Sequence, residues 1–210
     1  MAPRLTAQDC SLRVGLLGGT FDPPHYGHLA LAEAAREALE LERVIFLPNG
    51  QPPHKPTGEV SPAEHRYVMT ELACAAHPRF TVSRAEMDRP GLSYSLDTVR
   101  SVQRELGPEA QLYFIVGMDA LLELPLWHEP DALLAEAHVV VAERPGSETD
   151  LEAALGAERA AQVTRIAMPA LELSASDLRE RVRAGRSLWY LTPEPVAAYI
   201  AKHGLYRQST

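Results

Sequence analysis

Short apolar runs alternate along the chain with longer segments in which apolar residues recur at helical spacing. Uninterrupted runs such as Phe114-Ile115-Val116 and Val139-Val140-Val141 are typical of strands in a parallel sheet that is covered on both faces. The predicted strands are residues 12–17, 43–47, 79–83, 111–116, 138–142 and 163–167. The predicted helices are residues 29–41, 63–76, 96–106, 121–124 with 130–136, and 151–159.

Alternation of strands and helices predicts an α/β fold with a doubly wound, mainly parallel sheet of the Rossmann-like type. Ligands of such sheets bind beyond the carboxyl ends of the strands, where the strand order reverses. Two more helices are predicted at 177–183 and 195–203, the second capped by Thr192 and ended by Gly204. We therefore expect a single domain over residues 12–206, with a small C-terminal helical part at about 174–206. Residues 1–11 are expected to be a short extension.

The segment from Gly18 to Leu29, GGTFDPPHYGHL, follows the first predicted strand. Its glycines Gly18 and Gly19, with Thr20 and Phe21 after them, allow the backbone to approach a ligand closely, and the following helix start offers unpaired N–H groups to an anion. His25 and His28 are three residues apart, so both imidazoles face one side of a helix. The pattern predicts a polyphosphate site.

Other interpretations of this segment were weighed. The glycine spacing differs from the dinucleotide pattern G-x-G-x-x-G, and no P-loop lysine follows, which disfavours a redox Rossmann protein. A Pro/Gly turn that caps an ordinary core helix is the plain structural alternative. Two histidines without a third ligand make a poor zinc site, and we predict no metal held by side chains alone.

Composition narrows the function classes. The chain has 210 residues, a net charge of −8 and 46% apolar residues, which is ordinary for a globular enzyme and disfavours a general nucleic-acid binder. Its cysteines, Cys10 and Cys74, match no metal or redox spacing and are expected to be free thiols. No apolar run approaches the ~20 residues of a membrane span, and the first residues lack the apolar core of a signal peptide. We expect a cytoplasmic protein without membrane contact.

Further charged and hydroxyl groups fall beside the predicted strand ends. Lys55 lies in a Pro-rich loop after the second strand, where it can reach a phosphate, and Asp119 follows the fourth strand, where a carboxylate can hold a ribose or position a metal. Ser174 or Ser176 can cap a second helix start, and Arg179 lies one turn further on. Two helix starts suited to anions suggest a triphosphate held at both ends.

Aromatic and polar residues without core periodicity form a second group. They are Tyr94 with Ser95 before a helix, Trp127 in a Pro-flanked loop, and Arg144 after the fifth predicted strand at His138–Ala142. A flat indole together with hydroxyl and N–H donors suits a planar heteroaromatic acid. Trp127 serves equally well as a plug at the edge of the sheet.

Together these motifs resemble those of bacterial nicotinate-nucleotide adenylyltransferases, in the nucleotidyltransferase superfamily with the His/Thr-x-Gly-His motif. The matching pieces run in order from residue 12 to 206 and are 18–29, 52–55, 93–95 with 97–98, 117–119, 124–127, 144–146, 174–179 and 196–206. The resemblance implies transfer of the adenylyl group of ATP to nicotinate mononucleotide with Mg²⁺, giving deamido-NAD and pyrophosphate in NAD biosynthesis.

The resemblance also implies roles for individual residues. His25, His28, Lys55 and Arg179 would be catalytic. The ATP-binding set would be Gly18, Gly19, Thr20, Phe21, His25, His28, Asp119, Ser174, Ser176 and Arg179. The set around the mononucleotide would be Lys55, Tyr94, Ser95, Trp127 and Arg144.

Two positions depart from the family pattern, and several functions stay open. Ser95 replaces a threonine and keeps its hydroxyl, whereas Ala175 replaces a serine and loses one. The alternatives are the same chemistry on nicotinamide mononucleotide, phosphopantetheine or FMN, and a nucleotide-binding module without turnover. The sequence leaves the oligomeric state open and is compatible with a homo-oligomer.

Overall fold

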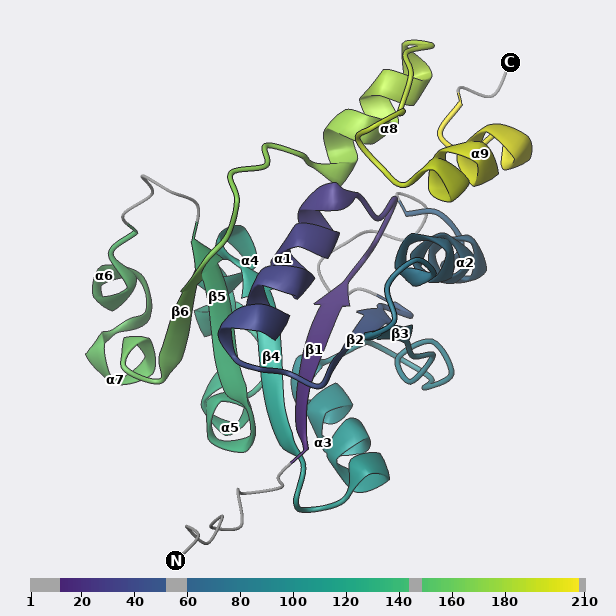
Figure 1. Cartoon of the computed structure of the whole chain (residues 1–210). Coiled ribbons are helices and arrows are strands. Elements are labelled where there is room, and N and C mark those ends of the chain that lie inside the picture. The colour runs from purple at the N-terminus through teal and green to yellow at the C-terminus, as the bar shows by residue number, and fades with distance from the viewer. Residues whose placement is uncertain (1–11, 52–59, 144–148, 208–210) are drawn as a thin grey trace, which may run out of the picture.

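The computed structural model describes residues 12–51, 60–143 and 149–207 (Figure 1). A sheet of six strands is flanked by helices, and every strand pair in it is parallel. The strands are β1 (Arg13–Gly19), β2 (Arg43–Pro48), β3 (Phe80–Val82), β4 (Gln111–Gly117), β5 (His138–Glu143) and β6 (Val163–Ala167). The predicted doubly wound α/β fold is confirmed.

The strand order is β3-β2-β1-β4-β5-β6. Chain connections therefore run outward from β1 on one side and from β4 on the other, and the order reverses between these two central strands. Leu17 of β1 pairs in register with Ile115 of β4, close to the carboxyl ends of both. Ligands of open parallel sheets bind at such a point.

Ten helices and short helical turns surround the sheet in the described part of the chain. They are α1 (Tyr26–Ala38), α2 (Ala63–Cys74), α3 (Ser95–Leu106), α4 (Met118–Leu122), η1 (Leu124–Leu126), α5 (Pro130–Glu136), α6 (Leu151–Leu155), α7 (Ala157–Ala160), α8 (Ala175–Arg183) and α9 (Glu194–His203). Figure 1 shows α8 and α9 beyond the carboxyl end of β1, at the same end of the sheet as the start of α1.

Side chains of each strand alternate between two apolar clusters, as the pleat of a sheet requires. Leu16 of β1 joins Val99 of α3 on one face, and the next residue, Leu17, joins Ala32 of α1 on the other. A third cluster unites α2, α8 and α9 through residues such as Leu178. The C-terminal helices are therefore anchored to α2 by apolar contacts.

Several predicted boundaries need correction. The first helix begins at Tyr26, not at residue 29, and the predicted helix 151–159 is broken in two at Gly156, whose φ of 83° interrupts helical geometry. The predicted cap of the last helix is wrong: Pro193 occupies that position, and the Thr192 hydroxyl donates instead to the carbonyl of Pro24 at 2.6 Å. Gly204 ends this helix with a φ of 62°, as predicted.

Two further expectations concern cysteine and membranes. Cys74 is a free, buried thiol. Burial, with a smaller contribution from the Glu71 carboxylate, raises its pKa to about 12, so the thiol is inert near neutral pH. Cys10 lies outside the described residues. Among the helices that the structure describes, none is long and apolar enough to cross a membrane.

Candidate functional site

The turn between β1 and α1 is shaped by Phe21. Its backbone adopts a φ of 50°, and its ring is buried at 1% exposure, in edge contact with His28 at 5.0 Å between centroids. A Cβ atom added to Gly19 would lie 2.9 Å from this ring, which is too close for any other residue. Gly19 is therefore required so that Phe21 can fold back beneath the turn.

His25 and His28 form a stacked pair at the start of α1. His25 is the N-cap residue, and its ring lies 3.8 Å from that of His28 with an angle of 30° between the planes. The backbone N–H of His25 donates to Nδ1 of His28 at 3.2 Å. Because Nδ1 accepts, the neutral His28 ring carries its proton on Nε2. The prediction that both imidazoles share one side is confirmed.

Burial favours the uncharged form of both rings. It lowers the pKa of His25 to about 4, and it lowers the pKa of His28 well below the usual range, with a smaller contribution from His25. Nδ1 of His25 is buried without a hydrogen-bond partner among the described residues. A buried nitrogen without a hydrogen-bond partner costs free energy, so a hydrogen-bonding ligand such as a phosphate oxygen suits this position.

The start of α8 lies against the same turn. Ser174 caps α8 by accepting from the backbone N–H of Asp177 at 3.1 Å. Arg179 donates through Nη1 to the carbonyl of Asp22 at 2.8 Å and through Nη2 to the hydroxyl of Ser176 at 3.2 Å. Two helix starts with positive dipole ends, one guanidinium and two imidazoles are therefore gathered beside the carboxyl end of β1.

A buried arginine that the sequence analysis missed ties the β1–α1 turn to both ends of the β2–α2 connection. Arg66 of α2 is 2% exposed and donates to the carbonyls of Ser61 at 3.0 Å, Thr20 at 3.0 Å and Gly50 at 3.1 Å. Burial lowers its pKa, and the nearby Asp22 carboxylate opposes this effect. The available signal was its place in a helical stripe with Met69 and Ala73, where an apolar residue is usual.

Asp22 is the second missed residue. It is 2% exposed, and its carboxylate accepts from the backbone N–H of Ser61 at 3.1 Å and from the hydroxyl of Tyr206 at 2.7 Å. Burial, with a smaller contribution from the negative charge of Asp22, raises the pKa of Tyr206. The turn that carries the histidines is thus fixed by α2, by α8 and by the last described residues of the chain.

The aromatic group lies at other strand ends of the same sheet. Tyr94 precedes α3, Ser95 is the first residue of α3, and the Tyr94 ring lies 4.4 Å from the ring of His128, the neighbour of Trp127 in sequence. Trp127 is partly buried and meets Phe114 of the central strand β4 edge-on at 6.1 Å, so it packs on a face of the sheet and not at its edge. The structure thus brings the two segments together.

Three single residues complete the account. Asp119 lies exposed in the first turn of α4, at the carboxyl end of β4 as predicted. Lys55 and Arg144 lie outside the described residues.

Comparison with known proteins gives concordant matches. Residues 16–181 match the family model described as cytidylyltransferase-like. The chain is 51% identical over 199 residues to a "Probable nicotinate-nucleotide adenylyltransferase" of Moorella thermoacetica, covering 93% of this chain and 92% of the relative. It is 44% identical over 201 residues to a relative of the same description from Acidothermus cellulolyticus, covering 94% and 95%.

Solved structures agree on the fold. The nicotinic acid mononucleotide adenylyltransferase of Plasmodium falciparum, complexed with NaAD, superposes with a TM-score of 0.75 at 18% identity, covering 92% of this chain and 97% of that one. Its complex with APC gives a TM-score of 0.73 at 17% identity, covering 92% and 96%. At this level of identity the similarity concerns the fold alone.

Proposed function

The chain belongs to the nicotinate-nucleotide adenylyltransferases, and we infer from this membership that it transfers the adenylyl group of ATP to nicotinate mononucleotide, giving deamido-NAD and pyrophosphate. It is a nucleotidyltransferase of NAD biosynthesis with a Rossmann-like fold.

One observation supports these roles most strongly. The stacked pair of His25 and His28 lies beside the start of α8, and the bond from Arg179 to the carbonyl of Asp22 at 2.8 Å ties the two segments together. Both helix starts therefore face the same end of the sheet, where its strand order reverses. A phosphate chain is the ligand that such a pair of helix ends favours.

The reaction needs no general base. A phosphate oxygen of the mononucleotide attacks the α-phosphorus of ATP, and pyrophosphate leaves with the electron pair of the broken P–O bond. The nucleophile is already ionised near neutral pH, because the second pKa of a phosphate monoester is about 6. The protein therefore acts by aligning the reactants and by stabilising the negative charge that develops on the phosphates.

We assign ATP to the β1–α1 turn and the start of α8. The neutral His28 ring would donate to a phosphate oxygen from Nε2, which carries the proton because Nδ1 accepts from the backbone of His25. His25 would bind a phosphate oxygen through Nδ1, which has no partner among the described residues. Arg179 with Ser176 would hold the far phosphates, and Ser174 would contribute mainly as the cap of α8. Gly18, Gly19, Thr20 and Phe21 would pack along the nucleotide, with Asp119 toward the adenosine. Lys55 and Arg179 would complete the catalytic set.

We assign the acceptor to the neighbouring aromatic group. Tyr94, Ser95 and Trp127 would surround the pyridine ring and its carboxylate, joined by Arg144 and Lys55. Tyr94 and Trp127 are suited to this because their segments already meet through His128.

Mg²⁺ fits this site as a companion of ATP. The described residues include no group of three His, Cys, Asp or Glu side chains that could cage a metal. Mg²⁺ commonly keeps several waters and is held by substrate phosphates, so the triphosphate would bring it into the site. When bound, it would neutralise part of the phosphate charge.

The decisive experiment measures pyrophosphate release from ATP with nicotinate mononucleotide and, separately, with nicotinamide mononucleotide or phosphopantetheine. We expect turnover with the nicotinate compound at the highest kcat/KM. Release without any acceptor would indicate simple hydrolysis, and no release with nicotinate mononucleotide would overturn the proposed function. A single domain over residues 12–206, a cytoplasmic location and a homo-oligomeric state stay predictions.

A further inference from the structure

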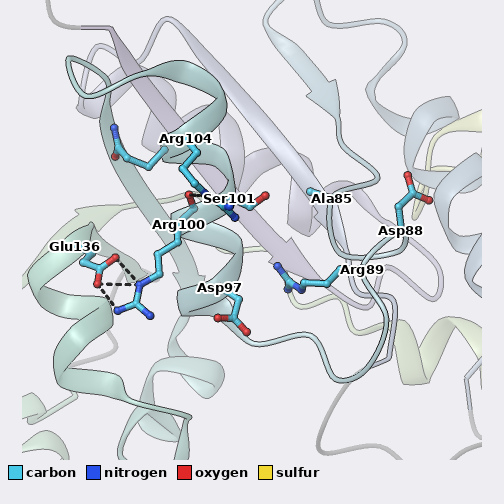
Figure 2. Close-up of a pocket in the computed structure, with 9 residues that line it drawn as sticks. Ala85, Asp88, Arg89, Asp97, Arg100, Ser101, Arg104 and Glu136 are labelled. Carbon is cyan, nitrogen blue, oxygen red and sulfur yellow. Dashed lines mark hydrogen bonds and ion pairs between the residues drawn. The ribbon is translucent and has the colours of Figure 1, made fainter.

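A cavity of about 850 Å³ is lined by residues of α3, of the segment before α3 and of α5 (Figure 2). Two of its arginines have partners: Arg100 pairs with Glu136 at 2.6 Å, and Arg89 donates inward to the hydroxyl of Thr98 at 2.9 Å. Figure 2 shows Arg89 extending from the loop of Ala85 and Asp88 toward α3. Arg89, at the wall of the cavity, is connected through the Thr98 hydroxyl to a buried carboxylate.

That carboxylate is Glu86, which is 3% exposed. One of its oxygens accepts from the Thr98 hydroxyl at 2.8 Å, and the other accepts from the side-chain amide of Asn49 at 2.8 Å. Asn49 follows β2 directly, and Thr98 lies in the first turn of α3. One buried carboxyl group thus joins the end of β2 to the start of the helix that carries Ser95.

Ser93 reinforces the same junction. Its hydroxyl accepts from the backbone N–H groups of Gly50 at 3.1 Å and Gln51 at 3.4 Å, and its own N–H donates to the Gln51 carbonyl at 3.0 Å. Gly50 packs so closely on the backbone of Glu86 that a side chain would collide with the Glu86 carbonyl oxygen. The residue that follows Ser93 is Tyr94, so little freedom is left to its backbone.

The carboxylate is retained at a cost. Burial raises the pKa of Glu86, while the bonds from Thr98 and Asn49 and the charge of Arg89 oppose the rise. A buried ionisable group of this kind is expensive, and an apolar side chain of similar size would fill the space more cheaply. The network therefore calls for a role beyond filling the core.

We propose that Glu86 is a positioning residue, whose bonds to Asn49 and Thr98 hold Tyr94 and Ser95 in the orientation that binds the acceptor mononucleotide. This inference rests on the proposed function, because that function places the acceptor against these two residues. Glu86 lies behind the site and acts through them. Its removal therefore weakens acceptor binding more than ATP binding, because Tyr94 and Ser95 adjoin the network directly. The β1–α1 turn meets the network through its backbone, where the N–H of Asn49 donates to the Gly19 carbonyl at 3.0 Å.

The test compares steady-state kinetics of Glu86→Gln with the unsubstituted enzyme, varying each substrate in turn. The amide keeps the shape but replaces one acceptor by a donor, so a bond to a charged group is lost. We expect KM for nicotinate mononucleotide to rise about tenfold, with KM for ATP changed less than about twofold. Glu105→Gln, the same substitution at an exposed position of α3, is the matched control and leaves both KM values unchanged.

A second pair of variants keeps the test decisive if Glu86→Gln folds poorly. Thr98→Val removes the hydroxyl and should reproduce the selective rise in acceptor KM, whereas Thr98→Ser restores the donor and should rescue it. Equal rises in both KM values, or a lower melting temperature with unchanged KM values, would overturn the positioning role. If the unsubstituted enzyme fails to use nicotinate mononucleotide, the proposed function falls instead.

Discussion

Replacing Arg66 by methionine probes the joint that supports the nucleotide turn. The methionine side chain fills similar space but leaves the carbonyls of Ser61, Thr20 and Gly50 without their donor. The carbonyls of Gly50 and Ser61 belong to the β2–α2 connection and that of Thr20 to the β1–α1 turn, so the substitution detaches both loops from α2 at one point. Asp22 also loses its nearby positive charge.

The expected magnitude follows from the burial of the guanidinium. Each bond from a charged donor contributes about 1.5–3 kcal/mol, and the desolvation of the charge offsets part of the total. Removing one partner from a buried charged arrangement typically costs about 3–5 kcal/mol. We expect Arg66→Met to lower the free energy of unfolding by about that amount. This is a large share of the total, since a typical domain has a free energy of unfolding of about 5–15 kcal/mol.

Urea denaturation followed by circular dichroism measures this change by linear extrapolation. Arg66→Lys keeps a charge but not the fork that reaches three carbonyls, so its loss should be intermediate. Arg104→Met is the control, because Arg104 is exposed and should cost less than about 0.5 kcal/mol. If Arg66→Met were no more destabilising than this control, the structural role assigned to Arg66 would be wrong.

Three further predictions concern the site and its supports. His28→Ala should lower kcat by about 10²–10³ with an unchanged circular dichroism spectrum, whereas His138→Ala, at the far end of β5, should not; near-normal turnover would refute the role of His28. Because burial lowers the pKa of His25 to about 4, only the unfolded chain binds its proton between pH 6.5 and about pH 4, so stability is lost as the pH falls through this window. Urea titrations at pH 7 and at about pH 4 measure how much free energy of unfolding is lost between these two pH values. This loss should be larger by about 3 kcal/mol in the unsubstituted protein than in His25→Asn, and equal losses would contradict the buried state of the ring. Gly50→Ala should cost about 1–3 kcal/mol because its methyl collides with the Glu86 carbonyl, and a neutral effect in the same assay would contradict that contact.

The order of elements could be predicted because apolar periodicity is a local property. Runs such as Val139-Val140-Val141 are buried on both faces of a parallel sheet and stand out in any window of the sequence. The position of His25 and His28 on one side of the helix start was likewise accessible, since a spacing of three residues sets it, whereas the stacking of the two rings was not predicted.

The supports of the site could not be predicted in the same way. Asp22 and Tyr206 are 184 residues apart in sequence, and Arg66 and Thr20 are 46 apart, so their hydrogen bonds leave no local pattern. Thr192 shows how such contacts override local rules: its residue type favours capping α9, but the Pro24 carbonyl provides its hydroxyl with a distant acceptor. Glu86 was missed for the same reason, because its partners come from β2 and α3.

The involvement of Arg179, Thr192 and Tyr206 with the β1–α1 turn has a consequence for synthesis on the ribosome. A nascent chain that has emerged only as far as β6 already contains every strand of the sheet described here, yet none of these three residues. The nucleotide-binding end is therefore completed last, after translation of the final helices. A chain terminated after β6 would keep its sheet strands but would lack the three side chains that hold the β1–α1 turn.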